Sequence, residues 1–142
     1  MRHYSKLLNN IGYKFKNYEF LEVALTHSSF DSRKMNYEKL EFLGDRVLGL
    51  IISECIFKKF KNDSEGELAK KFSFLVCKNT LKKIANVLDL QNFLNISKNL
   101  NIKSIDSIKA NSLEALIAAI FLDLKFKTVK KIVEKLWEDE IN

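Results

Sequence analysis

Residues 36–52 read Asn-Tyr-Glu-Lys-Leu-Glu-Phe-Leu-Gly-Asp-Arg-Val-Leu-Gly-Leu-Ile-Ile and combine a nearly continuous apolar run with three acids. Glu38, Glu41 and Asp45 are spaced i, i+3 and i+7, so a helix places them in one column. Apolar residues occupy most of the other positions, which predicts a buried helix. Carboxylates at this spacing repel one another and are unfavourable beside a core unless they have a partner. Divalent cations prefer carboxylate oxygens, so the pattern indicates a metal site.

The composition predicts one all-α domain that spans residues 1–142. Hydrophobic residues make up 46% of the chain and charged residues 30%, as in ordinary globular proteins. Pro is absent and Gly occurs only 4 times, so turn-forming residues are scarce. The net charge of +6 favours binding to phosphate backbones. However, nearly all basic residues are Lys, and an AT-rich genome produces the same bias, so charge alone does not decide between these explanations.

The ends and the cysteines predict a cytoplasmic protein without a membrane segment. The first residues lack the apolar core of a signal peptide, and the apolar stretch 113–124 contains Glu114 and Asp123 and is too short to cross a bilayer. Cys55 and Cys77 have no metal-ligand spacing, and we expect both to be buried thiols in a reducing compartment.

Hydrophobic periodicity predicts helices and no strands. Two of the helices, 37–59 and 107–124, are apolar on most sides and carry acids, so we expect them to pack together at the centre of the domain. Ser64 and Glu67 form a capping box for the helix that follows residue 64, and residues 92–106 are expected to include a loop. The other expected helices cover residues 7–12, 18–25, 79–88 and 127–140.

Residues 38–48, Glu-Lys-Leu-Glu-Phe-Leu-Gly-Asp-Arg-Val-Leu, resemble the nuclease signature of the ribonuclease III family. Three further segments resemble family motifs in the right order: Leu-Thr-His-Ser-Ser-Phe at 25–30, Glu-Gly-Glu-Leu at 65–68, and Ser-Ile-Lys-Ala-Asn-Ser-Leu-Glu-Ala-Leu-Ile-Ala-Ala-Ile at 107–120. The resemblance covers nearly the whole chain and implies the all-α nuclease domain of that family. Many members continue into a double-stranded-RNA-binding domain, for which 142 residues leave no room. The chain is therefore expected to work without it, or to be a fragment or a reduced version.

The resemblance also implies the site residues. Family members hold a divalent metal with four side chains, which correspond here to Glu41, Asp45, Asn111 and Glu114, and Asp45 and Glu114 are expected to be catalytic. Oxygen ligands from two facing helices suit Mg²⁺, with Mn²⁺ as a substitute, and no small-molecule cofactor is expected. Asn111 departs from the family pattern, which has Asp. Its neutral amide predicts a weakened ligand or one that acts through water.

Several neighbouring residues have open roles. Glu38 is expected to assist the site by orienting ligands or water. Glu65 is a second auxiliary candidate, although the N-terminus of its own helix is the favoured role. Arg46, where the family has a small residue, is expected to reach RNA, pair with an acid or, as the favoured alternative, lie solvated at the rim.

His27 and Phe42 complete the set of residues whose roles are open. His27 is expected to fix a turn rather than to bind metal. Phe42 is expected to insert into a second copy of the chain, because family members dimerise through this helix. The alternative for Phe42 is an ordinary core residue.

The resemblance implies a Mg²⁺-dependent endoribonuclease that acts as a homodimer on double-stranded RNA. Each of its two sites cuts one strand and leaves staggered ends, and ribosomal and other structured precursor RNAs are the expected substrates. Asn111 keeps open a second interpretation, an inactive member that serves as an RNA-binding or ribosome-associated protein. A helical scaffold or dimerisation module is a third, but it leaves the acidic column unexplained.

Overall fold

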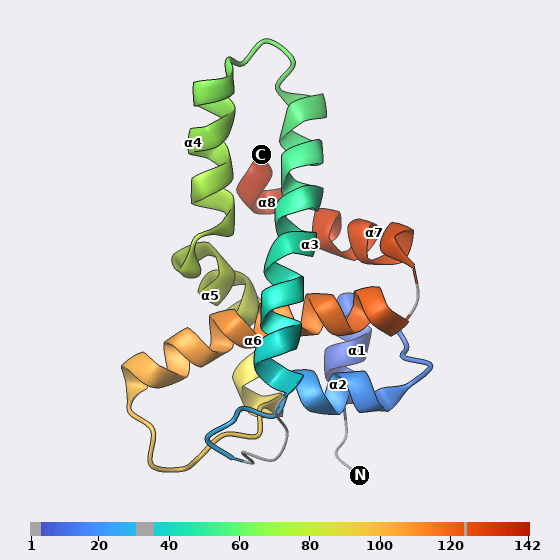
Figure 1. Ribbon diagram of the computed structural model, residues 1–142, viewed down its shortest axis with the longest axis vertical. Coiled ribbons are helices and arrows are strands. Elements are labelled where there is room, and N and C mark those ends of the chain that lie inside the picture. Colours follow the sequence, from blue (N-terminus) through green and yellow to red (C-terminus); the bar gives the residue numbers. More distant parts are fainter. Residues whose placement is uncertain (1–3, 31–35, 124) are drawn as a thin grey trace.

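The computed structural model describes residues 4–30, 36–123 and 125–142, and it is helical almost throughout (Figure 1). Within these ranges the residues form no strand, apart from an isolated bridge between Thr26 and Asn95. The predicted all-α class is therefore confirmed. The elements are α1 (Ser5–Ile11), α2 (Tyr18–Ala24), α3 (Asn36–Lys59), α4 (Glu65–Val76), α5 (Lys78–Val87), the 3₁₀ helix η1 (Leu90–Phe93), α6 (Ile102–Asp123), α7 (Phe126–Leu136) and α8 (Glu138–Ile141).

The two acid-bearing helices, α3 and α6, cross at the centre of the molecule. In Figure 1, α3 stands upright and α6 passes behind it. Residues 112–120 of α6 are all buried, and they pack on Leu48, Ile51 and other residues of α3 in one hydrophobic core. The helices are in close backbone contact at Gly44, where an added Cβ would lie 1.7 Å from the carbonyl oxygen of Glu114. Only glycine allows this approach.

The remaining helices cover this crossing. α4 folds back beside α3 and starts at the predicted capping box. There the Ser64 side chain accepts a hydrogen bond from the Glu67 backbone N–H, and the Glu67 side chain accepts one from the Ser64 backbone N–H. At the other end, the Asp123 carboxylate closes α6 by accepting hydrogen bonds from the Tyr13 hydroxyl (2.5 Å) and from the backbone N–H groups of Lys16 and Asn17 (2.7 and 2.8 Å). This contact fixes the entry to α2 against the C-terminal end of α6.

Two helix boundaries differ from the sequence expectation by more than two residues. α6 starts at residue 102 rather than 107, because the Asn101 side chain caps it by accepting the Ser104 N–H (2.9 Å). The helix expected over 127–140 is two helices, α7 and α8, separated at Trp137. Trp137 is fully buried and its indole N–H donates to the Leu75 carbonyl (2.9 Å), so its backbone leaves helical geometry to bring the indole there.

The expected burial of both cysteines and of the whole of α3 is wrong. Cys55 and Cys77 are partly exposed, since Cys55 lies on an outer part of α3 and Cys77 at the bend between α4 and α5. On α3, Phe42, Leu50 and Phe57 are 62%, 60% and 69% exposed. Their spacings of eight and seven residues place them on one side of the helix. We call these three residues the exposed stripe of α3.

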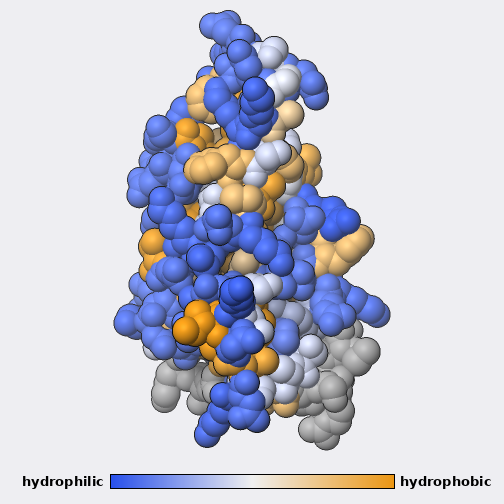
Figure 2. Space-filling model, turned by 90° about the vertical axis from the view of Figure 1, so that its left-hand side faces the viewer, coloured by the Kyte–Doolittle hydropathy of each residue, from blue (hydrophilic) through white to orange (hydrophobic). Residues whose placement is uncertain are grey.

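The face on which α4 and α5 lie is mainly polar. Figure 2 shows hydrophilic residues over most of the side where α4 and α5 lie, with hydrophobic residues gathered in patches between them. None of the helices in the described ranges is both long and apolar enough to span a membrane.

Candidate active site

A hollow of about 510 Å³ opens where α3, α5 and α6 meet, and we call it the acidic hollow. All four predicted metal ligands line it, together with the predicted auxiliary Glu38 and the predicted dimer residue Phe42. The lining residues are His27, Tyr37, Glu38, Glu41, Phe42, Asp45, Arg46, Lys78, Asn111 and Glu114. The crossing of two helices thus brings together acids that lie about seventy residues apart in the sequence.

Glu114 is the most perturbed acid of the acidic hollow. It is only 8% exposed, and burial, a hydrogen bond with the Asp45 side chain and the charges of Asp45 and Glu41 raise its pKa to about 8. Burial also raises the pKa of Glu41, with Glu38 and Asp45 adding to the effect and Lys78 opposing it. The carboxyl groups therefore disfavour one another's ionisation when no cation is present.

This crowding is the property that a divalent cation relieves. Among the described residues, no three His, Cys, Asp or Glu side chains are already gathered tightly enough to hold an ion. The donor set nevertheless fits a hard cation, because Glu41, Asp45 and Glu114 offer carboxylate oxygens and Asn111 offers an amide oxygen around one solvent-accessible space.

The raised pKa predicts that stability falls with pH when metal is absent. The native protein keeps the Glu114 proton up to about pH 8, whereas the unfolded chain loses it near the ordinary value of 4.5. Between these values the native state binds more protons, so the free energy of unfolding decreases as pH rises. We expect the Glu114→Gln variant to gain about 1–2 kcal/mol over the wild type between about pH 6 and pH 8 in EDTA. Urea unfolding of both proteins at several pH values measures this gain, and parallel stability curves would contradict it.

His27 and Tyr37 form the wall of the acidic hollow between α2 and α3. His27 Nδ1 accepts a hydrogen bond from the Ser29 backbone N–H (3.0 Å), which matches the expected turn-fixing role and leaves the ring proton on Nε2. Burial lowers the pKa of His27, so the neutral form is favoured. Its ring packs edge-on against Tyr37, with ring centres 5.2 Å apart, and the Tyr37 hydroxyl lies 3.1 Å from Ser112 Oγ. This chain of contacts braces α3 against α6.

Arg46 lies exposed at the acidic hollow, as the favoured alternative predicted, and it also contacts two neighbouring residues. Its guanidinium lies 3.0 Å from Asp45 Oδ2, donates to the Phe42 carbonyl oxygen (3.3 Å) and stacks over the Phe42 ring at 3.9 Å. The helix places Arg46 one turn after Phe42 and next to Asp45, so a single side chain reaches all three. Arg46 therefore combines two of the alternatives, the solvated rim position and the pairing with an acid.

The structure does not bring Glu65 to the acidic hollow. It is the exposed first residue of α4 and lines another hollow with Phe57 and Phe72. Glu65 lies in the first turn of α4, where a carboxylate stabilises the N-terminus of the helix, which is the role that the sequence favoured. Conversely, sequence reasoning missed Lys78, the first residue of α5, which lines the acidic hollow. Nothing in the sequence distinguished it from the many other lysines, because only the tertiary arrangement places it there.

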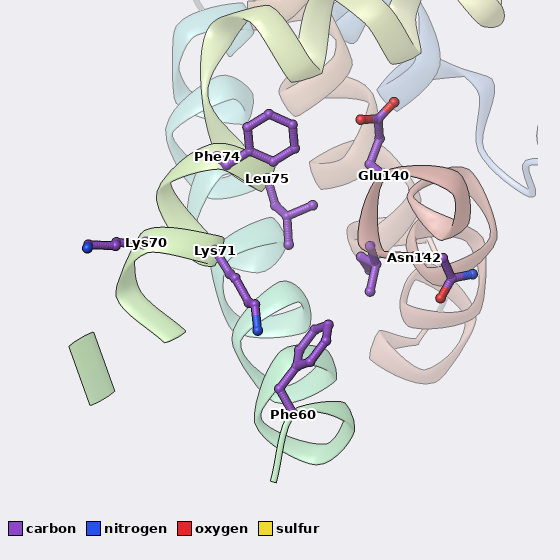
Figure 3. Close-up of a pocket in the computed structure, with 8 residues that line it drawn as sticks. Phe60, Lys70, Lys71, Phe74, Leu75, Glu140 and Asn142 are labelled. Atoms are coloured by element: carbon purple, nitrogen blue, oxygen red, sulfur yellow. The ribbon is translucent and has the colours of Figure 1, made fainter. Parts of the chain in front are cut away.

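A second hollow, of about 350 Å³, lies between α4 and α8 and has a different character (Figure 3). Phe60, Phe74 and Leu75 give it an apolar wall, and Lys70 and Lys71 lie on the α4 side. Its one carboxylate among the lining residues, Glu140, is paired with Lys83 at 2.7 Å. This hollow therefore lacks the clustered acids that make the acidic hollow a candidate for chemistry.

Comparison with known proteins identifies the family. Residues 17–140 match the family model described as Ribonuclease-III-like. The chain belongs to the ribonuclease III family. Two curated relatives, both named Ribonuclease 3, come from the Wolbachia of Brugia malayi (42% identical) and from Clostridium tetani (43% identical). Each alignment covers 95% of this chain but only 58% and 63% of the relatives, so the chain spans about three fifths of their length.

Solved structures of the ribonuclease III family match this fold closely. The nuclease domain of ribonuclease III from Campylobacter jejuni is 41% identical with a TM-score of 0.90, and the match covers 96% of this chain and 97% of that one. That structure was described for flexibility in a region involved in dimer formation. Dicer from Pichia stipitis matches with a TM-score of 0.70 and 28% identity, over 89% of this chain and 56% of the Dicer chain. The fold is therefore that of a ribonuclease III nuclease domain.

Proposed function

We propose that this chain is a Mg²⁺-dependent endoribonuclease that cuts both strands of double-stranded RNA to staggered ends, with Mn²⁺ as a substitute metal. The observation that carries the proposal is the convergence of Glu41, Asp45, Asn111 and Glu114 in the acidic hollow, with the pKa of Glu114 raised by its neighbours. Family membership adds support, since relatives are named Ribonuclease 3 and Dicer. Hydrolysis of a phosphodiester requires neutralised charge and positioned water more than a strong base.

The four proposed ligands come in pairs from two helices. Glu41 and Asp45 line the acidic hollow from α3, Asn111 and Glu114 line it from α6, and together they would hold the cation. A divalent cation supplies Lewis acidity toward the phosphate and acidifies water. Glu38, exposed on the same column of α3, orients water or a ligand. The Glu114 carboxyl must give up its proton to serve as a ligand, so cation binding and proton release are coupled.

Selection of the duplex is proposed to rest on shape and on 2′-hydroxyl and phosphate contacts rather than on base sequence. The net charge of +6 favours such contacts. Ribosomal and other structured precursor RNAs in the cytoplasm are the proposed substrates, because they contain long helical segments.

Incubation with a long RNA duplex tests the proposal directly. The purified chain is expected to cut the duplex in Mg²⁺ or Mn²⁺ and to leave it intact in EDTA. Single-stranded RNA and a DNA duplex of the same sequence serve as controls for shape and for the 2′-hydroxyl. No cleavage at low salt and high enzyme concentration in either metal would reject the endonuclease and leave the inactive RNA-binding or ribosome-associated alternative, which Asn111 favours.

A homodimer is proposed to form through the exposed stripe of α3. One small domain leaves Phe42, Leu50 and Phe57 uncovered, and large exposed apolar side chains on one helix face are typical of an interface. In a symmetric dimer the two acidic hollows face one duplex, so that each cuts one strand.

The dimer proposal predicts a specific effect of Phe42→Ala. We expect this substitution to raise the dimer dissociation constant by about tenfold or more, because a buried aromatic anchor contributes about 2 kcal/mol or more to an interface. Sedimentation equilibrium measures the change. Phe74→Ala is the matched control, since Phe74 is 58% exposed on α4 and lies outside the stripe. Equal dissociation constants for wild type and Phe42→Ala would contradict the proposed interface.

The side chain at position 111 is expected to affect the Mg²⁺ concentration that cleavage requires. An amide oxygen binds Mg²⁺ less tightly than a carboxylate, so Asn111→Asp is expected to lower the Mg²⁺ concentration for half-maximal cleavage by about three- to tenfold, with little change in RNA affinity. Titration of the metal on one duplex substrate compares the two proteins. An unchanged or higher requirement would mean that the acidic hollow is adapted to the amide and that Asn111 is not a weakened ligand.

A further inference from the structure

Lys78 is the one basic side chain that α5 contributes to the acidic hollow. Its ammonium group donates a hydrogen bond to Ser107 Oγ on α6 (3.2 Å). Ser107, Asn111 and Glu114 are spaced i, i+4 and i+7, so they stack on one side of α6. The hydrogen bond therefore holds the ammonium group of Lys78 at the end of the column that contains the two proposed ligands.

The charge of Lys78 is held without an acidic partner in the part of the chain that the structure describes. Its neighbours on α5 differ, because Lys82 lies 3.7 Å from Asp106 and Lys83 lies 2.7 Å from Glu140. The other cation of the acidic hollow, Arg46, is paired with Asp45. Lys78 is bound by a neutral hydroxyl group, so its full positive charge remains available to a ligand.

The position of Lys78 makes that ligand an anion. Lys78 is exposed, and its charge acts on both Glu41 and Glu114 without forming an ion pair with either. An ammonium group that only neutralised the acids would lie in contact with one of them. A cation fixed beside a set of metal ligands instead suits a phosphate group, which needs positive charge from the metal on one side and from the protein on the other.

We propose that Lys78 binds a backbone phosphate of the RNA strand that is cut, and that Ser107 positions it for this contact. The inference rests on the proposed endonuclease function and adds to it a substrate-binding residue from α5. The contact would place the phosphate against the metal ligands from the α5 side, and it would strengthen as negative charge builds on the phosphate during hydrolysis.

The test compares Lys78→Met with Lys78→Arg and Lys70→Met. Methionine removes the charge and keeps most of the side-chain volume, whereas arginine keeps the charge. Lys70 is an exposed lysine on α4, away from the acidic hollow, so its substitution makes the same change in net charge. For Lys78→Met we expect kcat at saturating duplex RNA to fall by about ten- to hundredfold, and for Lys78→Arg to return within about threefold of wild type. Lys70→Met is expected to leave kcat unchanged.

Binding without cleavage provides the second readout. In EDTA, Lys78→Met is expected to weaken duplex binding by about fivefold. The slope of log Kd against log salt concentration is expected to fall by about one, which corresponds to the loss of one phosphate contact. Ser107→Ala, which keeps the charge and loses the positioning hydroxyl, is expected to lower kcat by about threefold with an unchanged salt dependence. Fluorescence anisotropy over a salt series in EDTA measures Kd and its salt dependence, and the cleavage assay measures kcat.

The outcomes separate this inference from the proposed function. If the wild type cuts RNA and Lys78→Met retains wild-type kcat and Kd, the phosphate contact is rejected and the endonuclease stands. Equal losses of kcat in Lys78→Met and Lys70→Met also reject it, because the effect is then one of net charge. If the wild type does not cut but Lys78→Met alone loses affinity and salt dependence, the phosphate contact stands and the endonuclease does not.

Discussion

The Glu114→Gln substitution is expected to lower the rate of duplex RNA cleavage by about a thousandfold or more. Glutamine keeps the shape of the side chain but removes the negative charge that the cation requires. Glu114 is buried where α3 and α6 cross, and it is the carboxylate that α6 contributes to the acidic hollow. Asp45→Asn, which removes the carboxylate that pairs with both Glu114 and Arg46, is expected to have a similar effect.

Single-turnover cleavage with excess enzyme measures the chemical step in both variants. RNA affinity in EDTA is expected to stay within about threefold of wild type, because the affinity comes from contacts to phosphate and not from the acids. Glu138→Gln, at an exposed carboxylate on α8, is the matched control and is expected to cut at the wild-type rate. A Glu114 variant that cuts within tenfold of wild type would remove this residue from the proposed ligand set.

The central part of the fold follows from patterns that lie within single segments. The runs around 38–52 and 107–120 are apolar on most sides, which predicts two helices that pack together through their apolar residues, although one side of α3 remains exposed. The Ser64 and Glu67 capping box is likewise local, since both bonds close within one helical turn. Local patterns therefore suffice to predict α3, α4, most of α6 and the acidic column of α3, whereas the resemblance to the ribonuclease III family implied that Asn111 and Glu114 join Glu41 and Asp45 in one site.

Features that depend on contacts between distant segments were not predictable in this way. Trp137 ends α7 because its indole reaches the Leu75 carbonyl, sixty-two residues away in the sequence. Lys78 lines the acidic hollow only because α5 packs beside α6, and the stripe of α3 is exposed because none of the described helices packs over it. Asn101 extends α6 through a cap whose side chain is indistinguishable in the sequence from those of the neighbouring Asn residues.

The residue that joins fold and site most directly is Gly44, and Gly44→Ala is expected to have the largest effect on stability. An added Cβ would lie 1.7 Å from the carbonyl oxygen and 2.5 Å from the carbonyl carbon of Glu114. These are backbone atoms inside a buried helix, so they cannot rotate away as a side chain does. The two helices must separate, which costs about 3 kcal/mol or more of packing energy. We expect the melting temperature to fall by about 10 °C.

Gly49→Ala is the matched control, because Gly49 lies on the same helix and an added Cβ would meet only the Phe72 ring, at 3.5 Å, an ordinary contact. Replacement of a helical glycine by alanine without a clash stabilises by about 0.5–1 kcal/mol. Thermal unfolding is therefore expected to move in opposite directions for the two variants. Gly66→Ala on α4, where only Ser64 Oγ lies within 4 Å, repeats the control away from the exposed stripe of α3.

Activity adds a second measure, because the separation of α3 from α6 moves Glu41 and Asp45 away from Glu114. Even at a temperature where Gly44→Ala remains folded, we expect it to require more Mg²⁺ for cleavage than Gly49→Ala. A Gly44→Ala protein that melts at the wild-type temperature and cuts at the wild-type Mg²⁺ concentration would show that the two helices do not meet as described. The spacing of the proposed ligands would then have to arise from some other contact.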